Sequence, residues 1–454
     1  MPIEPVCSAR ERRNQSSNSM KQNVPAAIPP TALILIVTLF FLWGLANNLN
    51  DVLLPHLRKA FFLNDLQSSL VQSAFYLGYF LFALPAGWCI RRYGYKTTVL
   101  IGLVTFGIGA LLFYPAAQWL RYGLFLAALF VIAAGLAFLE TSANPLITVL
   151  GDARSTEQRL NLAQAFNPLG AIAGVVIGRE FILSGIEPTT AELGAMSNAQ
   201  LLAFQLSEAR SVQLPYLIIA AVVLLWAALV ATTKFPPQAE AATGNDPHPV
   251  SMRQSIAALL VKRRFLFGVA AQFFYVGAQV GVWSFMIRYA QAEVPGMGEK
   301  TAAGYLTASL VGFMIGRFAG TAMMSRIRPA RLMACFAGIN VCLTAMAALL
   351  GGQIGLVALA ATSLFMSIMF PTIFASSLRN LGALTQVASS FLVMSIIGGA
   401  VLTAVMGAIS DAAAINYAML VPTVCFIVIG WFAWTTAPQS ADGLAAVAPG
   451  AHSL

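Results

Sequence analysis

Long apolar stretches recur along the whole chain, and they restrict its fold more than any other feature. A helix that crosses the hydrocarbon core of a bilayer needs about 20 mainly apolar residues. Membrane β-strands would instead appear as alternating segments of about 10 residues. Twelve stretches meet the helical requirement, at approximately residues 31–57, 67–90, 97–118, 122–150, 160–184, 214–233, 265–291, 301–324, 331–350, 353–378, 386–410 and 415–436. The sequence therefore predicts an all-α integral membrane protein with 12 transmembrane helices.

The composition agrees with a membrane protein and excludes several other classes. Charged residues make up only 9% of the 454 residues, and the mean hydropathy is +0.77, whereas a soluble domain has about 25% charged residues. A soluble enzyme, a disordered chain and a nucleic-acid-binding module are therefore excluded. The five cysteines and three histidines are scattered, so neither a metal site nor a disulfide framework is predicted. No nucleophile–base set or phosphate-binding loop indicates a membrane enzyme, and no cofactor is expected.

The positions of the basic residues predict the orientation in the membrane. An even number of spans places both termini on the same side. With the N-terminus inside, the inner segments contain 18 of the 26 Lys and Arg residues. Cytoplasmic loops carry an excess of positive charge, so we expect both termini in the cytoplasm. No apolar segment precedes the first span at a cleavable distance, and no signal peptide is expected.

The longest inner segment divides the chain into two similar halves. Residues 236–261 are polar and contain four prolines, Pro236, Pro237, Pro247 and Pro249. They separate a half at 29–235 from a half at 262–437, with tails at 1–28 and 438–454. Spans four and ten, which are equivalent in the two halves, are similar because one contains Asn144-Pro145 and the other Phe370-Pro371. Two six-helix halves resemble the plan of the major facilitator superfamily, in which the binding site lies at the interface of the halves near mid-membrane.

The loop between spans two and three also resembles a motif of that superfamily. Residues 87–96 read GWCIRRYGYK, with Arg91 in the place where the motif usually has an acid. The alternative interpretation is that these basic residues anchor the loop on the inner side of the membrane.

Two acidic residues lie inside apolar spans, where an ionisable group is costly and is a functional candidate. Asp51 is in the first span and Glu140 is in the fourth, and neither has a Lys or Arg within one helical turn. Desolvation favours the protonated form of such a carboxyl group, which can then take up and release a proton. Both residues are therefore predicted to couple transport to protons. The alternative is a polar group that only hydrogen-bonds to neighbouring helices, or an interfacial residue if the span ends lie elsewhere.

Amide and aromatic side chains extend these acids into polar stripes at helical spacing. The stripes on spans one, four, five and seven contain Trp43, Asn47 and Asp51; Glu140, Asn144 and Thr148; Asn161, Gln164 and Asn167; and Gln272, Tyr275, Gln279 and Trp283. Amides and carboxylates hydrogen-bond sugar hydroxyls, and an aromatic ring covers the C–H face of a pyranose while an indole N–H adds a donor. Together the stripes predict a sugar site. The alternatives for single residues are that amides join helices and that tryptophans lie at the membrane interface.

Other charged residues within the spans are expected to have structural roles. Arg288 lies near the outer end of its span and can extend to the interface. Arg317 is deeper and is expected to pair with an acid or with a helix C-terminus. Arg179 and Glu180 are adjacent and are expected to neutralise each other.

Several strings make the family resemblance more specific. "FFLWGLANNLNDVLLPHL", "LETSANPLITVLG", "RLNLAQAFNPLGAI" and "QFFYVGAQVGVWSFMIRYA" are similar to the fucose–galactose–glucose:proton symporter family of the major facilitator superfamily. The resemblance implies import of L-fucose together with protons in a bacterial inner membrane, and a monomer with sugar, protons and lipid as its partners. Asp51 matches the family's proton-linked acid, and Glu140 matches its substrate- and coupling-linked acid. The matching cavity positions are Trp43, Asn48, Gln164, Asn167, Gln279 and Trp283.

Other functions compete with this one. Relatives in the same family carry glucose or galactose. A drug/proton antiporter of the superfamily is disfavoured, because span five has glycines without a Pro-Gly pair and the predicted cavity is rich in amides. A sugar sensor without transport is disfavoured by the presence of both Asp51 and Glu140.

The choice of sugar leads to one further expectation. L-fucose has a methyl group on C5, and an apolar wall is predicted to face it. The candidate wall residues lie on spans eight and ten and are Phe313, Phe365, Met366, Met369, Phe370 and Phe374.

Overall fold

The computed structural model describes residues 30–63, 65–149, 153–177, 196–235 and 251–436. Within these ranges the chain forms α-helices, short 3-10 turns and connecting loops, and no strand, which confirms the predicted all-α class. The two predicted tails and residues 236–250 of the predicted linker lie outside the described residues. The assignment of 29–235 and 262–437 as separate halves stays a prediction.

The helices follow each other along the chain in two series. The first comprises α2 (Pro30–Phe61), α3 (Asp65–Gln118), α4 (Tyr122–Val149), α5 (Thr156–Gln164), α6 (Phe166–Ile177), α8 (Asn198–Ser211) and α9 (Gln213–Thr232). A short helix, α11 (Met252–Leu260), precedes the second series. This comprises α12 (Arg263–Glu293), α13 (Glu299–Met323), α14 (Pro329–Leu350), α15 (Gly352–Met366), α16 (Met369–Leu378), α17 (Thr385–Met394), α18 (Gly398–Ala412), α19 (Ile415–Ala418) and α20 (Leu420–Thr436).

Each predicted span corresponds to one helix, to part of one long helix or to two consecutive helices. Nine helical segments of the described chain are long and apolar enough to cross a membrane, and Thr31–Ala46 adds a shorter apolar helix. The helix α3 contains predicted spans two and three, which are separated by a bend at Gly94 with φ 81°. Only glycine adopts such a φ without strain. Spans five, ten and eleven are each broken, into α5–α6, α15–α16 and α17–α18.

Two helices were not predicted from the apolar pattern, because polar capping residues rather than hydrophobic runs start them. The Ser197 hydroxyl accepts a hydrogen bond from the Gln200 N–H at the start of α8, and the Gln200 side chain accepts one from the Ser197 N–H. Ser251 and Gln254 form the same reciprocal arrangement at the start of α11. Both are capping boxes, in which Ser and Gln three residues apart satisfy two otherwise unpaired N–H groups.

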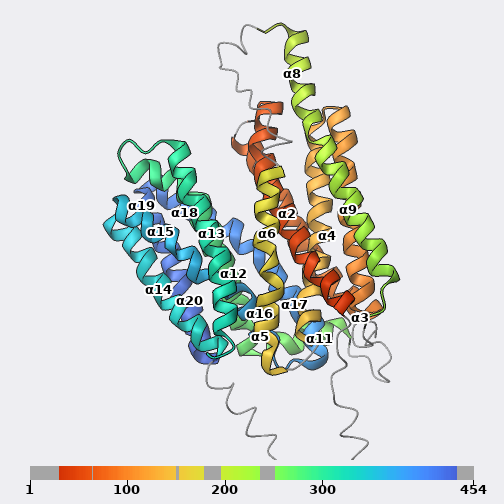
Figure 1. Cartoon of the computed structure of the whole chain (residues 1–454), viewed down its shortest axis with the longest axis vertical. Helices are drawn as coiled ribbons and strands as arrows, with labels where there is room; N and C mark the ends of the chain where they lie inside the picture. Colours follow the sequence, from red (N-terminus) through yellow and green to blue (C-terminus); the bar gives the residue numbers. More distant parts are fainter. Residues whose placement is uncertain (1–29, 64, 150–152, 178–195, 236–250, 437–454) are drawn as a thin grey trace, which may run out of the picture.

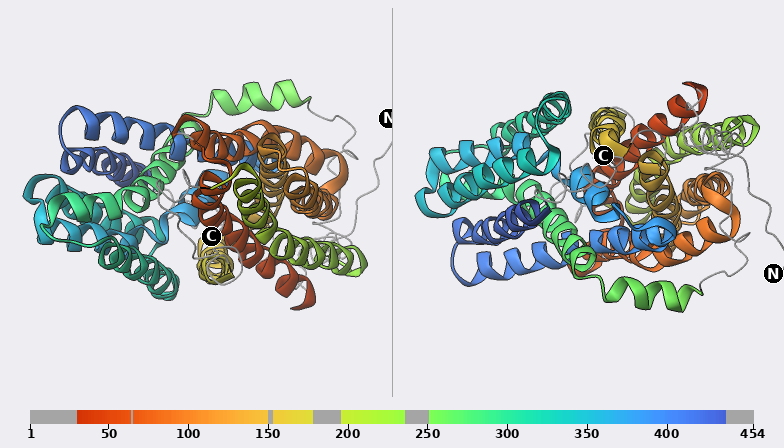
Figure 2. Two further views of the ribbon diagram at one scale, coloured as in Figure 1. Left: turned by 90° about the horizontal axis from the view of Figure 1, so that it is seen from above. Right: turned by 90° about the horizontal axis from the view of Figure 1, so that it is seen from below.

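The two series lie side by side as two groups of helices. Viewed along the long axis, α2–α4, α6, α8 and α9 lie on one side and α12–α15, α18 and α20 on the other (Figure 2). The groups converge at the end of the molecule where α5, α16 and α17 lie, and they diverge toward the end where α8 projects (Figure 1). At the converging end α5 packs on α16 and α13, and α17 packs on α3 and α4.

Close helix contacts in the first group depend on small residues. A Cβ atom at Gly44 of α2 would overlap the Asn167 carbonyl of α6, and one at Gly170 would overlap the Phe41 carbonyl. Small residues let membrane helices approach to backbone contact. Two predicted site residues belong to the segments in this contact, namely Trp43, which precedes Gly44 in the sequence, and Asn167 of α6.

Candidate functional site

The strongest candidate for a functional group is a buried carboxyl group in α4. Glu140 is 0% exposed, and neither of its carboxyl oxygens has a hydrogen-bond partner among the described residues. Buried polar groups in proteins almost always have a partner, and an acid in a transmembrane helix is costly. A group in this setting is suited to binding a proton or the hydroxyl of a ligand.

Asn144, one helical turn further along α4, extends the polar patch. Its Oδ1 accepts a hydrogen bond of 2.8 Å from Gln164 Nε2 of α5, whereas its Nδ2 has no partner in the described structure. Thr141 on the same helix is also buried, and its hydroxyl is unpaired there. The side chains of α4 therefore offer a carboxyl group, an amide donor and a hydroxyl at adjacent positions.

Trp43 and Asn167 come from the contact between α2 and α6. The Trp43 ring is 8% exposed, and its Nε1 has no partner among the described side chains and backbone. Asn167 is half-buried and donates from Nδ2 to the Phe40 carbonyl at 3.3 Å. The predicted residues Asn47, Asn48 and Asp51 lie on α2, but their side chains fall outside the described residues. Their roles remain predictions.

The second group contributes the stripe on α12. Gln272 is 0% exposed, and neither polar atom of its amide has a partner in the described chain. Tyr275 is buried with its ring 6.0 Å from that of Phe370. Gln279 and Trp283 are half-buried further along the helix. This helix therefore carries two amides and two aromatic side chains, and their role in binding stays a prediction.

The indole of Trp283 is held by contacts within the second group of helices. Its Nε1 donates to the Ser363 hydroxyl at 2.9 Å, and that hydroxyl also bonds to Ser309. The Phe313 ring packs against the indole edge-on, at 5.1 Å between ring centroids and 78° between planes. The indole donor is thus used within the protein. Ser309 and Ser363 were missed because isolated serines in apolar helices give no pattern.

The predicted apolar wall is only partly assembled. Met366, Met369 and Phe374 are fully buried in packed apolar clusters. Phe313 contacts Trp283, Phe370 lies beside Tyr275, and Phe365 packs on Phe336 at 5.3 Å. Of the six wall residues, Phe313 and Phe370 thus adjoin the α12 stripe.

Amides on α5 join helices as well as forming a stripe. Asn161 donates to Thr372 Oγ1 of α16 at 3.1 Å. At the same end, Arg379 forms an ion pair with Glu157, which is 3% exposed. No local sequence pattern indicates this pair, because its members are separated by 222 residues.

Other charged residues follow the structural roles expected of them. Arg317 is 3% exposed and donates to the carbonyl of Gln164, the last residue of α5, so the expected pairing with a helix C-terminus is confirmed. Arg288 is exposed and lies 4.1 Å from the centroid of the Phe285 ring. Arg179 and Glu180 lie outside the described residues.

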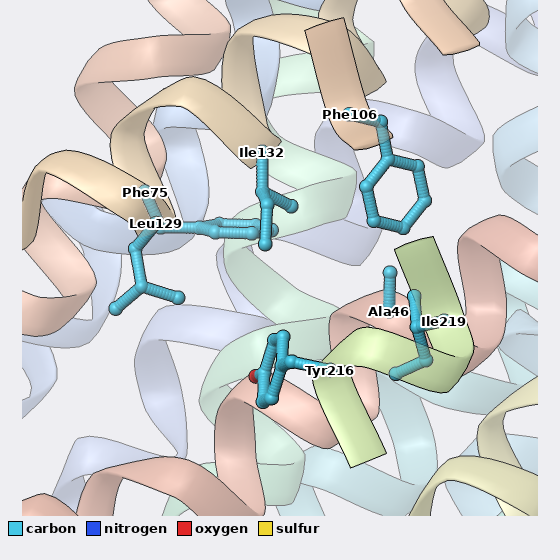
Figure 3. Close-up of a pocket in the computed structure, with 7 residues that line it drawn as sticks. All are labelled: Ala46, Phe75, Phe106, Leu129, Ile132, Tyr216 and Ile219. Atoms are coloured by element: carbon cyan, nitrogen blue, oxygen red, sulfur yellow. The ribbon is translucent and has the colours of Figure 1, made fainter. Parts of the chain in front are cut away.

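A separate pocket in the first group is apolar. Its lining comes from α2, α3, α4 and α9 and consists of Ala46, Phe75, Phe106, Leu129, Ile132, Tyr216 and Ile219 (Figure 3). Sites for polar small molecules contain several convergent hydrogen-bonding groups. Tyr216 supplies the only side-chain polar atom in this lining, so this pocket does not suit a sugar and is distinct from the patch around Glu140.

Comparisons with known proteins agree with this architecture. A family model described as Major Facilitator Superfamily matches residues 36–403. The L-fucose-proton symporter of Escherichia coli (strain K12) is 49% identical over 405 residues, which cover 88% of this chain and 91% of that protein. The glucose/galactose transporter of Brucella abortus biovar 1 (strain 9-941) is 36% identical over 402 residues, covering 88% of this chain and 93% of the other.

Solved structures give the same result. A crystal structure of a major facilitator superfamily transporter, described as in the outward conformation, matches with a TM-score of 0.83 and 48% identity, covering 89% of this chain and 98% of that one. A proton:xylose symporter matches with a TM-score of 0.64 at 14% identity and supports the fold alone. The all-helical architecture, the family model and the relatives agree, and the chain belongs to the fucose, galactose and glucose:proton symporter family of the Major Facilitator Superfamily.

Proposed function

We propose that this protein is a proton-coupled symporter that imports L-fucose by alternating access. The observation that carries the proposal is Glu140, a fully buried carboxyl group whose oxygens have no partner in the described structure. The 49% identity to an L-fucose-proton symporter supports both the sugar and the coupling ion. No cofactor besides the transported proton is needed.

The sugar is bound between the two groups of helices. On one side Glu140, Asn144 and Trp43 offer hydrogen-bonding groups that are unpaired within the described chain. On the other side Gln272 offers an unpaired amide, and Trp283 offers its ring face. A pyranose has hydroxyls at its rim and C–H groups on its faces, so amides and rings together match its chemistry. Gln164, Asn167, Tyr275 and Gln279 complete the proposed set.

Protonation of Glu140 couples the sugar to the proton. A neutral carboxyl group can donate to a sugar oxygen and can cross between states without a buried charge, whereas the carboxylate cannot. Asp51 is proposed as the second coupling acid on the basis of its place in the sequence and the family resemblance. Asn47 and Asn48, on the same helix, are proposed as sugar contacts on the same basis.

The arrangement of the helices supports an outward-facing state. The ion pair of Glu157 with Arg379 and the bond of Asn161 to Thr372 join the groups at one end. That end carries the Gly94 bend and α11, which belong to segments predicted to be cytoplasmic. We therefore propose that the inner end is closed here. A monomer in the bacterial inner membrane, with both termini cytoplasmic and lipid around the spans, completes the proposal.

Uptake into proteoliposomes tests the function. Labelled L-fucose should accumulate when a proton gradient directed inward is imposed, and it should only equilibrate when the gradient is collapsed. Accumulation that ignores the gradient would contradict proton coupling. Efflux of dyes against the same gradient, without sugar uptake, would indicate an antiporter.

A second candidate is glucose/galactose–proton symport. It is favoured by the relative from Brucella abortus and by the putative glucose/galactose transporter of Helicobacter pylori (strain ATCC 700392 / 26695), which is 37% identical over 407 residues. The same vesicles distinguish the candidates. Accumulation of D-glucose or D-galactose without any response to L-fucose would establish the second.

A further inference from the structure

Arg317 of α13 has an unusual position for a charged residue. It is 3% exposed, and its guanidinium carbon lies 4.6 Å from the centroid of the Phe313 ring. Its Nε donates to the Ser367 carbonyl at 2.7 Å, and its Nη1 donates to the Gln164 carbonyl at 3.0 Å. Burying a guanidinium within a membrane protein is costly, so these two acceptors should explain why the charge is placed here.

Each of the two carbonyls precedes a proline by four residues. In an α-helix, the N–H of one residue donates to the carbonyl four residues earlier. Pro168 follows Gln164 at this distance and Pro371 follows Ser367, and proline has no N–H to donate. Both carbonyls thus lack their usual helical partner, and Arg317 supplies a donor to each.

The helices are broken at these same positions. The helix α5 ends at Gln164, and α15 ends at Met366, directly before Ser367. A helix C-terminus carries partial negative charge that favours a nearby cation. Arg317 therefore lies where two C-terminal ends meet, one from each group of helices.

Local packing brings Arg317 to these ends. A Cβ atom at Gly316 would overlap the Leu364 carbonyl of α15. The missing side chain lets α13 approach α15 to backbone contact. This approach places the neighbouring Arg317 within reach of the Ser367 carbonyl.

One of the two clamped residues also reaches the candidate site. Gln164 donates from its side chain to Asn144, which lies one turn from Glu140 on α4. The backbone of Gln164 is therefore bonded to the second group while its side chain is bonded to the proposed sugar-binding patch.

We propose that Arg317 is a positioning residue that clamps two proline breaks across the interface of the groups. The clamp stabilises the arrangement in which the inner end is closed, and it holds Gln164 against Asn144. When the groups rearrange, the bond to Gln164 breaks while the bond to Ser367, within its own group, can persist. This proposal rests on the alternating access included in the proposed function, and it does not depend on which sugar is carried.

Distance measurements between spin labels test the clamp without sugar. Labels are attached at Asn198 and Gln291, both exposed, after the five native cysteines have been replaced. Arg317→Met removes both donors. The ratio of the population of molecules with the long distance to the population with the short distance should then fall by about tenfold or more, as expected for a lost charge-assisted hydrogen bond. Arg317→Lys keeps the charge but not the fork of donors, and it should restore the ratio only in part.

Arg288→Met is the matched control, because Arg288 also lies over a phenylalanine ring but is exposed. Its distance distribution should equal that of the unmodified protein. A distribution for Arg317→Met that equals that of Arg288→Met would overturn the proposal.

A second variant tests the role of the proline directly and keeps Arg317. Pro168→Ala supplies an N–H that can bond to the Gln164 carbonyl within the helix, so this carbonyl depends less on Arg317. The effect of Arg317→Met on the distance ratio should then be smaller in the Pro168→Ala background. Pro85→Ala, at an exposed helical proline, should leave that effect unchanged. Equal effects of Arg317→Met in both proline backgrounds would show that the break and the clamp are independent.

Discussion

Replacing Glu140 by glutamine should abolish active transport while leaving the protein folded. The side chain is 0% exposed, and its oxygens have no hydrogen-bond partner in the described structure. Glu140→Gln keeps the volume of the side chain and breaks none of the hydrogen bonds described here. Large losses of stability come from cavities, unpaired buried charges or broken networks, and this substitution creates none of them.

The size of the effect follows from the work that one proton can do. A membrane potential of 100 mV provides about 2.3 kcal/mol per elementary charge. Since about 1.4 kcal/mol corresponds to a factor of ten, one proton per sugar supports about 50-fold accumulation of L-fucose. A carrier that moves no proton can only equilibrate the sugar, so the accumulation ratio should fall to about 1.

The assay is accumulation of labelled L-fucose in proteoliposomes at a fixed potential. Glu208→Gln is the matched control, because Glu208 is a second acid of the first group and is 1% exposed. It should accumulate the sugar as the unmodified protein does. Unchanged accumulation by Glu140→Gln would refute the assignment of Glu140 as a coupling group.

Three other predictions test the remaining parts of the site. Asp51→Asn should lose accumulation but keep sugar exchange between equilibrated compartments, and continued proton-driven uptake would contradict a coupling role for Asp51. Sugar binding should change tryptophan fluorescence, and Trp43→Phe or Trp283→Phe should reduce the change; a full signal in both variants would mean that other tryptophans report it. L-galactose differs from L-fucose by one hydroxyl, and desolvating that hydroxyl against Phe313 and Phe370 without a new partner costs roughly 1–3 kcal/mol. L-galactose should therefore compete about tenfold to a hundredfold more weakly, and equal competition would mean that the wall is absent.

The sequence was informative where a residue's environment is local. The burial of Glu140 could be predicted because the residues that surround it along the chain are apolar, and a membrane-spanning helix buries them together. The spans could be predicted for the same reason, because length and apolarity alone decide whether a helix can cross a bilayer. The bend at Gly94 falls in the loop predicted between spans two and three, whereas the break before Phe166 was not predicted, since it depends on backbone geometry.

Residues whose roles depend on distant partners could not be predicted. The sequence indicated an indole ring and an indole donor at Trp283, and the structure shows that the N–H bonds to Ser363, 80 residues away in the sequence. No pattern in either helix indicates this partner. Met366 and Met369 were expected to form part of a wall on span ten, but both are 0% exposed within a packed apolar cluster. Side-chain direction after a helix break is a tertiary property.

The position of the polar bonds on α5 explains how the groups can be joined and still separate. Gln158, Asn161 and the Gln164 carbonyl each bond to a residue of the second group. The two neutral bonds contribute only about 1 kcal/mol each and the bond from Arg317 about 1.5–3 kcal/mol, because water replaces the partner when they break. An apolar interface would instead cost about 25 cal/mol for each Å² of apolar surface that becomes exposed to water when it opens. An intact helix would satisfy its own carbonyls and offer none to a partner, so a proline break gives α5 one more exchangeable bond. A junction that must open in every transport cycle is therefore better made from such bonds than from an extended apolar surface.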